Sequence, residues 1–168
     1  MKKVVLYLLT ISAVFAIDIQ TQIDLCNNEN DYHACGIVGA LYYLQNTDKD
    51  ELSLSYYMKG KIMMEKLCSV TDLDASAVTD LTACQSLGDN YEVGLPGYNQ
   101  NIRIAMKYYN IVLDSERLSC NDGDESSCFK LGLDYSAKGL IYDPIKATKY
   151  FKKACKLGEE NACEWESL

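Results

Sequence analysis

Paired cysteines constrain this chain more than any other feature of its sequence. Cys120 and Cys128 enclose seven residues, and so do Cys155 and Cys163. A helix rises 1.5 Å per residue, so cysteines eight positions apart on one straight helix would lie about 12 Å apart. A disulfide tolerates roughly 7 Å between Cα atoms. The chain must therefore turn back within each pair, which predicts a staple between the end of one helix and the start of the next.

Three stretches of the chain align on a cysteine and share one pattern. They are CGIVGALYYL from Cys35, CQSLGDNYEV from Cys84 and CFKLGLDYSA from Cys128. An apolar residue, a glycine and a tyrosine recur three, four and seven positions after the cysteine. These positions share one face of a helix, which we name helix A. Glycine lowers helix propensity, so its recurrence predicts that another helix crosses closely at this point.

A second amphipathic stretch, helix B, follows each helix A. Asp143 and Pro144 begin the clearest one, as N-cap and first helical residue. Gly158 is placed to end it. The anchors of the three helices B are Ser53, Tyr56 and Tyr57, then Ala105, Tyr108 and Tyr109, then Ala147, Tyr150 and Phe151.

The first two helices B carry more residues than the third. From the first anchor tyrosine to the closing cysteine there are twelve residues in those two units and five in the third. Seven additional residues are nearly two helical turns, which return the cysteine to almost the same face. The additional residues, within 58–68 and 110–120, either lengthen helix B or form a loop. The run from Asp114 to Glu116 is compatible with a break, and the sequence does not decide between the two.

Residues 1–16 have the pattern of an export signal. Lys2 and Lys3 precede the apolar run VVLYLLTISAV, and small residues lead up to Ala16. The run is short for a membrane span. We therefore predict a signal peptide over 1–16, a mature domain over 17–168, and a periplasmic or secreted protein without a membrane anchor.

The mature domain is acidic. Loss of the two lysines takes the formal charge from −8 to −10, which argues against nucleic acid and anionic membranes as partners.

All eight cysteines follow this leader, and an even number in an exported chain predicts a disulfide framework. Eight cysteines allow 105 connectivities, so spacing alone selects none of them. The repeat selects one. Pairing by unit joins Cys26 with Cys35, Cys68 with Cys84, Cys120 with Cys128, and Cys155 with Cys163. The fifteen-residue loop of the second pair makes it the least constrained.

A period of 35 to 49 residues with two helices per unit predicts an all-α fold. Each unit would bury its apolar face on its neighbours in an α/α solenoid of about three stapled hairpins. The units lie approximately at 33–68, 82–120 and 126–155. The segment before Cys26 is expected to be a partial helix B, and the tail from Glu164 the start of another helix A.

Residues 120–163 resemble a known repeat family. Their pattern is Cys-x-x-Leu-Gly-x-x-Tyr, then Asp-Pro-x-Lys-Ala-x-x-Tyr-Phe-x-Lys-Ala-Cys-x-x-Gly. It is similar to the Sel-1-like repeat, a relative of the tetratricopeptide repeat, whose disulfide-bridged form occurs in the secreted Helicobacter cysteine-rich proteins. The resemblance is good for 84–109 and weaker for 26–68. It implies a superhelix whose concave surface binds peptides or folded proteins.

By resemblance to tetratricopeptide repeats, the concave positions lie one, five and eight residues after each helix A cysteine. They are Gly36, Ala40 and Tyr43, then Gln85, Asp89 and Glu92, then Phe129, Leu133 and Ser136. This surface would be acidic in the middle and apolar at one end. We therefore expect a protein or peptide partner that is basic or amphipathic.

The resemblance also implies an alternative function, because penicillin binding and weak β-lactamase activity are reported for members of this family. Ser127 and Lys130 satisfy S-x-x-K, which would place a lysine one helical turn from a nucleophile. The partner motifs S-D-N and K-T-G are absent. We therefore predict no catalytic residue, and keep a β-lactam or cell-wall ligand as the alternative.

Metal binding is not expected. Zinc sites need cysteines two to four residues apart and usually histidine, whereas the spacings here are seven or more and His33 is the only histidine. Asp72, Asp74 and Asp80 resemble a calcium loop only loosely, since its glycine and closing glutamate are missing. Most of the thirteen tyrosines are explained as repeat anchors. The sequence therefore predicts no metal and no cofactor.

Overall fold

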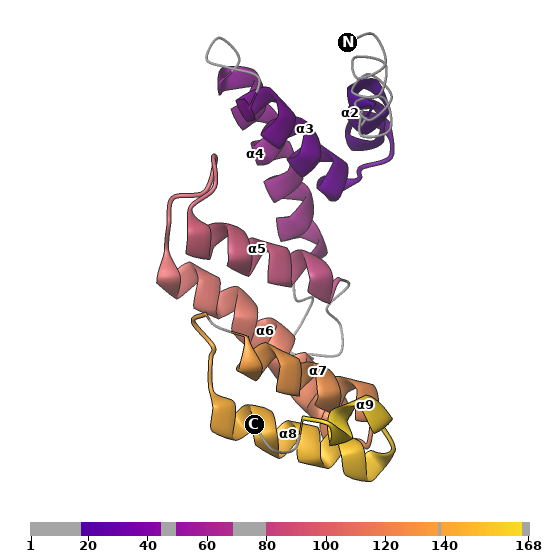
Figure 1. The fold of residues 1–168 in the computed structure, drawn as a ribbon. Coiled ribbons are helices and arrows are strands. Elements are labelled where there is room, and N and C mark those ends of the chain that lie inside the picture. The colour runs from indigo at the N-terminus through magenta and orange to yellow at the C-terminus, as the bar shows by residue number, and fades with distance from the viewer. Residues whose placement is uncertain (1–17, 45–49, 69–79, 138, 166–168) are drawn as a thin grey trace, which may run out of the picture. The chain divides into compact units, whose positions relative to one another are not determined.

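The computed structural model describes residues 18–44, 50–68, 80–137 and 139–165. These residues form α-helices and no strands. In chain order the helices are α2 (Ile19–Asn28), α3 (Tyr32–Leu44), α4 (Asp50–Leu67), α5 (Leu81–Val93), α6 (Ile102–Asn121), α7 (Glu125–Ser136), α8 (Pro144–Leu157) and α9 (Glu160–Cys163) (Figure 1). The predicted leader over 1–16 lies outside the described residues, as do Asp72 and Asp74.

The helices pair as predicted for an α-solenoid of hairpins. Helices α3, α5 and α7 correspond to helix A, and α4, α6 and α8 to helix B. Contacts divide the chain into two compact units, one up to Met63 and one from Met64 onward. The first holds α2, α3 and most of α4, and the second holds α5 to α9. None of the described helices is both long and apolar enough to cross a membrane.

Side-chain caps fix where the helices begin and end. Asp143 accepts the backbone N–H of Lys146 at 3.0 Å, and Pro144 is the first residue of α8. Gly158 ends α8 in the left-handed region, with φ of 117°. Both predictions are confirmed. Asp80, whose likeness to a calcium ligand was too loose to predict a site, is the N-cap of α5.

The additional residues of the first two helices B lengthen the helix. Helix α4 has 18 residues and α6 has 20, against 14 in α8. The run from Asp114 to Glu116 lies inside α6 and does not interrupt it. The prediction left a helix and a loop as alternatives, and the helix is correct because nearly two complete turns keep the closing cysteine on the same face.

Recurrent glycines mark the points where helix B crosses helix A. A Cβ built on Gly132 would lie 2.5 Å from two ring carbons of Phe151, a distance that real Cβ atoms do not occupy. Gly88 faces the ring of Tyr109 even more closely, and Gly39 faces Tyr57 in the same way. The close crossing predicted from the glycine pattern is therefore confirmed.

The tyrosine seven positions after each helix A cysteine stacks on the first anchor tyrosine of helix B. Tyr135 and Tyr150 have ring centroids 5.8 Å apart and planes within 6° of each other. The equivalent pairs are Tyr42 with Tyr56 at 5.8 Å and Tyr91 with Tyr108 at 6.0 Å. The tyrosine anchors thus stabilise each hairpin by the offset stacking that aromatic pairs favour.

Four disulfides join the end of one helix to the start of the next. They are Cys26–Cys35, Cys68–Cys84, Cys120–Cys128 and Cys155–Cys163. These are the pairs that the repeat predicts, with Cα atoms 4.7 to 5.0 Å apart. Each bond therefore spans the turn that the spacing of the cysteines required.

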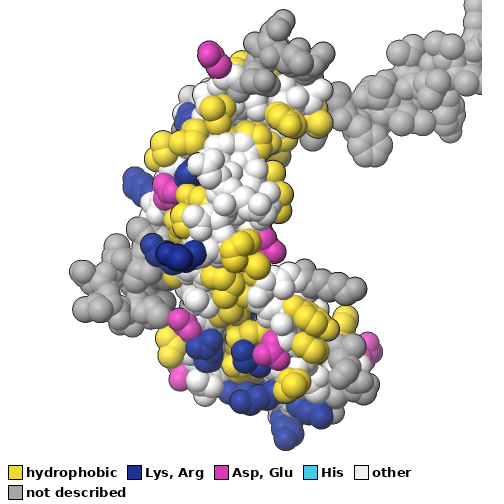
Figure 2. Space-filling view, turned by 90° about the vertical axis from the view of Figure 1, so that its left-hand side faces the viewer, with side chains coloured by type: hydrophobic (Ala, Val, Ile, Leu, Met, Phe, Trp, Pro, Cys, Tyr) yellow, Lys and Arg dark blue, Asp and Glu magenta, His cyan; other side chains and the backbone are white. Residues whose placement is uncertain are grey.

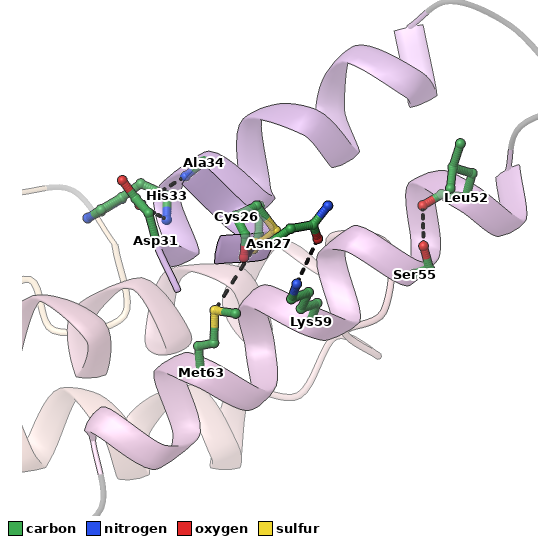
Figure 3. Close-up of a disulfide and its surroundings, with 10 residues drawn as sticks. Cys26, Asn27, Asp31, His33, Ala34, Leu52, Ser55, Lys59 and Met63 are labelled. Atoms are coloured by element: carbon green, nitrogen blue, oxygen red, sulfur yellow. Dashed lines mark hydrogen bonds between the residues drawn. A yellow bond between two sulfur atoms is a disulfide. The ribbon is translucent and has the colours of Figure 1, made fainter. Parts of the chain in front are cut away.

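An asparagine after the cysteine adds a second link in two of the repeats. Lys59 of α4 donates to the side-chain oxygen of Asn27 at 2.7 Å, beside the Cys26–Cys35 bond (Figure 3). Lys153 of α8 donates to Asn121 at 3.2 Å. The chain therefore repeats a hydrogen bond from helix B to the residue that follows the stapled cysteine.

Candidate functional site

A small cavity in the second unit gathers carboxylates from two helices. Helix α5 contributes Gln85, Asp89 and Glu92, α6 contributes Tyr109, and α7 contributes Asp134. Ala137 and the segment from Gly139 to Ile141 complete its wall, and the volume is about 120 Å³. We name this cavity the acidic pocket.

The α5 residues of the pocket share one face of their helix. Gln85, Asp89 and Glu92 are spaced by four and three residues, so their side chains lie in a row. Asp80 begins this helix by accepting the backbone N–H groups of Thr82 and Ala83. Local capping and helical periodicity therefore determine which three side chains the helix presents together.

Tyr109 links the two acidic side chains of α5. Its hydroxyl lies 2.8 Å from Oδ1 of Asp89 and 2.6 Å from Oε2 of Glu92. A hydroxyl donates only one hydrogen, so it serves one carboxylate at a time. Burial raises the pKa of Tyr109, and the adjacent carboxylates raise it further. Tyr109 therefore remains a neutral donor next to more acceptor atoms than it can satisfy.

Two neighbours approach these carboxylates without neutralising them. The Gln85 amide donates to Asp89 at 3.1 Å. A Cβ on Gly139 would lie 3.6 Å from Oε1 of Glu92, so the backbone of the α7–α8 loop comes close to this carboxylate. Among the residues that the structure describes, the lining of the pocket thus has three carboxyl groups and no cationic side chain.

A buried glutamate interacts with the third carboxylate of the pocket. Glu116, on the lengthened part of α6, is 3% exposed. The Lys130 ammonium lies 2.5 Å from its Oε1. Burial raises the pKa of Glu116 to about 7, Lys130 opposes the shift, and the carboxylate of Asp134 adds to it. The charge around Asp134 therefore depends on a group that titrates near neutral pH.

The chemistry of the acidic pocket suits a cationic side chain with several N–H groups. An ammonium carries three donors and a guanidinium five, which matches a surplus of carboxylate oxygens. The described residues contain no group of three His, Cys, Asp or Glu side chains that could hold a metal ion. The pocket can therefore receive a lysine or arginine side chain.

The predicted concave residues do not all line one site. Gln85, Asp89 and Glu92 line the acidic pocket. Phe129 packs on the core of the second unit, with its ring 5.7 Å from that of Phe151. Three others lie outside the pocket: Tyr43 and Leu133, which are exposed, and Ser136, whose hydroxyl donates to the Leu133 carbonyl.

Sequence reasoning missed three contributors to the pocket. Tyr109 was assigned only to the repeat core, although its hydroxyl extends beyond the ring contact with Gly88. Asp134 and the segment from Gly139 belong to the next hairpin and gave no signal in the pattern of α5. Only the packing of consecutive repeats brings them together.

The S-x-x-K residues lie on the first turns of α7. The Ser127 backbone N–H donates to Asp124, the N-cap of the helix, at 2.6 Å. The Lys130 ammonium contacts Glu116 and not the serine. His33 is exposed, and its ring lies 4.1 Å from that of Tyr32. This part of the chain does not present the hydrogen-bonded nucleophile and base of a serine enzyme.

The pocket coincides with a recognised repeat. A family model described as Sel1 repeat matches residues 82–111 and 125–159. The first match contains Gln85, Asp89, Glu92 and Tyr109, and the second contains Asp134 and the α7–α8 loop. No curated protein matches the chain. The acidic pocket therefore lies where two successive repeats meet.

Proposed function

Because the chain carries two Sel1 repeats and four disulfides, we propose that it is an exported scaffold that binds a basic segment of a partner protein in the acidic pocket. Sel1 repeats are protein-interaction scaffolds, which gives the class of function. The pocket supplies the finer part of the proposal, namely which surface binds and what it recognises.

The surplus of carboxylate oxygens around Tyr109 carries this proposal. One hydroxyl hydrogen lies between Asp89 and Glu92, at 2.8 and 2.6 Å, and Asp134 adds a third carboxyl group to the same wall. Charge-assisted hydrogen bonds to a lysine or arginine would satisfy these oxygens. Such a partner would be anchored by one or two long basic side chains.

The cysteines support an exported location. Disulfides persist in oxidising compartments and are rare in the cytosol, and this chain has four. The predicted signal peptide over 1–16 is consistent with the same location. We therefore propose that the protein works in the periplasm or outside the cell.

A peptide array tests this function. Each test peptide on the array would carry lysine or arginine at one position. Its control peptide would carry the neutral isostere, norleucine or citrulline, at the same position. We expect the oxidised protein to retain the basic members and release the neutral ones. In fluorescence anisotropy with retained peptides, Asp89→Asn with Glu92→Gln should weaken binding about tenfold or more, since truncated charge pairs cost about 1 to 3 kcal/mol.

A matched variant separates the pocket from general charge. Asp122→Asn with Glu164→Gln removes the same charge from two exposed residues outside the pocket. We expect it to bind within twofold of the unmodified protein. Equal weakening in both variants, or equal retention of basic and neutral peptides, would refute the proposal.

A further inference from the structure

A row of lysines covers one face of the last long helix. Lys149, Lys152 and Lys156 follow one another at three and four residues along α8, and Lys153 flanks them. With Ile145 and Thr148 they line an open depression of about 480 Å³. Figure 2 shows basic side chains gathered at the lower end of the view, where Figure 1 places α8. We name this surface the lysine face.

Within the described part of the chain, no carboxylate neutralises the lysine face, and its lining contains no acidic side chain. Of the four lysines, only Lys153 has a hydrogen-bond partner among the described residues, the neutral amide of Asn121. Like charges on neighbouring turns of a helix destabilise it slightly. A chain with a formal charge of −8 thus concentrates uncompensated positive charge on one helix face.

An apolar residue begins the row. Ile145, one turn before Lys149, is 83% exposed, which makes it one of the most exposed large apolar side chains of the described residues. A purely ionic ligand, such as a sulfated polysaccharide, would leave it in water. A ligand that also carries an apolar side chain would remove it from water, which is worth about 25 cal/mol per Å² buried.

The spacing of the lysines indicates the geometry of the ligand. Steps of three and four residues correspond to about 4.5 and 6 Å along the helix axis. A second helix has the same rise, so its carboxylates three and four residues apart stay in register with the ammonium groups. An extended segment places side chains of one face about 6.6 Å apart and loses register by the third lysine.

We propose that the lysine face is a second interaction surface, which binds an acidic amphipathic helix of a partner protein. An apolar side chain of that helix covers Ile145, and its carboxylates pair with Lys149, Lys152 and Lys156. This surface differs from the acidic pocket in its residues and in the sign of its charge. The proposal therefore does not depend on the function assigned to the pocket.

A designed helical peptide tests the proposal. The probe is a fluorescein-labelled peptide with glutamates at steps of three and four residues and a leucine one turn before the first. We expect the oxidised full chain to bind it, and Lys149→Gln with Lys152→Gln to weaken binding about tenfold, since two ion pairs contribute up to about 1 kcal/mol each. Ile145→Ser should weaken it about threefold.

Matched controls separate this surface from general charge. Arg103→Gln with Lys107→Gln removes two exposed cations of α6 that lie outside the lysine face, and should change affinity less than twofold. Circular dichroism melts of all variants would verify that they are folded. A probe with glutamine in place of every glutamate should not bind.

Three results with the acidic probe would overturn the proposal. They are no binding of the acidic probe, unchanged binding by the Lys149 and Lys152 variant, and equal loss in the Arg103 and Lys107 variant. Dextran sulfate serves as a competitor without apolar groups. A second probe has serine in place of the leucine. If dextran sulfate and this second probe both bind as tightly as the original probe, the surface is a general polyanion site and the proposal of an acidic helix is refuted.

Discussion

Single residues at the crossing of helix A and helix B determine how closely the hairpins pack. Gly88 and Gly132 leave the space that the rings of Tyr109 and Phe151 occupy. The same crossing directs the Tyr109 hydroxyl toward Asp89 and Glu92. The ring of Tyr109 therefore packs in the core, while its hydroxyl contacts the carboxylates of the candidate site.

Substitution of Gly132 by alanine should destabilise the fold. The added Cβ would lie 2.5 Å from the Phe151 ring, which is fully buried. Overpacking of this kind costs about 1 to 3 kcal/mol. Gly36→Ala is the matched control, because no atom lies within 4 Å of its Cβ and alanine favours the helix by up to about 1 kcal/mol. Urea unfolding would measure the free energy of unfolding of both variants. A Gly132→Ala variant as stable as the parent would contradict the packing argument.

Glu116 should make stability depend on pH. Its pKa is about 7 in the folded chain and 4.5 ordinarily, so the folded state binds the proton more tightly. The resulting penalty is absent below about pH 4.5 and complete above about pH 7. We expect the free energy of unfolding to fall by on the order of 2 kcal/mol between these limits.

The variant Glu116→Gln should remove most of this fall, because a neutral amide does not titrate. The exposed Glu125→Gln variant is the control and should retain it. Urea unfolding at several pH values would measure the effect. An unchanged pH dependence in Glu116→Gln would show that another group is responsible.

Hydrolysis of a β-lactam should not depend on Ser127. Lys130 is engaged by Glu116, and the Ser127 backbone N–H donates to Asp124, the N-cap of α7. We expect nitrocefin turnover by the purified protein to be no faster than turnover by its Ser127→Ala variant. Turnover that survives purification and is lost in that variant would instead support the hydrolase alternative.

At the scale of the elements, staples and helix length act together. Between the first anchor tyrosine and the closing cysteine, α4 and α6 have seven more residues than the third repeat, which is nearly two turns, yet their closing cysteines still meet the following helix A. In α6 these turns also carry Glu116 to the surface of α7, where Lys130 and Asp134 face it. The longer helix B of the second repeat therefore adds polar contacts to the repeat that follows it.

Reduction of the disulfides should unfold much of the chain. Each enclosed loop contributes about 2.5 to 3 kcal/mol by chain entropy, and four of them approach the net stability of about 5 to 15 kcal/mol that domains have. Helical circular dichroism melts with and without excess reductant would measure this. Superimposable melts would mean that packing alone holds the hairpins.

At the scale of the whole molecule, opposite charges are segregated onto different elements. A chain of net charge −8 carries an acidic pocket on α5 and α7 and a lysine face on α8. The two proposed surfaces would therefore bind partners of opposite charge. Net charge alone excluded classes of partner but could not reveal the lysine face.

The exported protein should contain no free thiol and should begin at Ile17. The first expectation follows from the four disulfides, and the second from the leader pattern that ends at Ala16. Thiol trapping followed by a non-reducing peptide map would test both. Free thiols, or links that join cysteines of distant repeats, would contradict the pairing.

The sequence by itself determined the features that depend on local spacing. Helix pairs, caps at Asp143 and Gly158, the glycine crossings and the cysteine pairs all follow from the helical period and from the reach of a disulfide. The family resemblance additionally predicted that Gln85, Asp89 and Glu92, three residues of the acidic pocket, lie on one surface.

Only the tertiary structure decided the rest. It made α6 continuous past Asp114, buried Glu116, and placed Tyr109, Asp134 and the α7–α8 loop around Asp89 and Glu92. The helical period allows both a loop and two further turns, so it could not choose between them. Contacts between successive repeats depend on which faces cover each other, and that is a property of packing and not of the spacing within one helix.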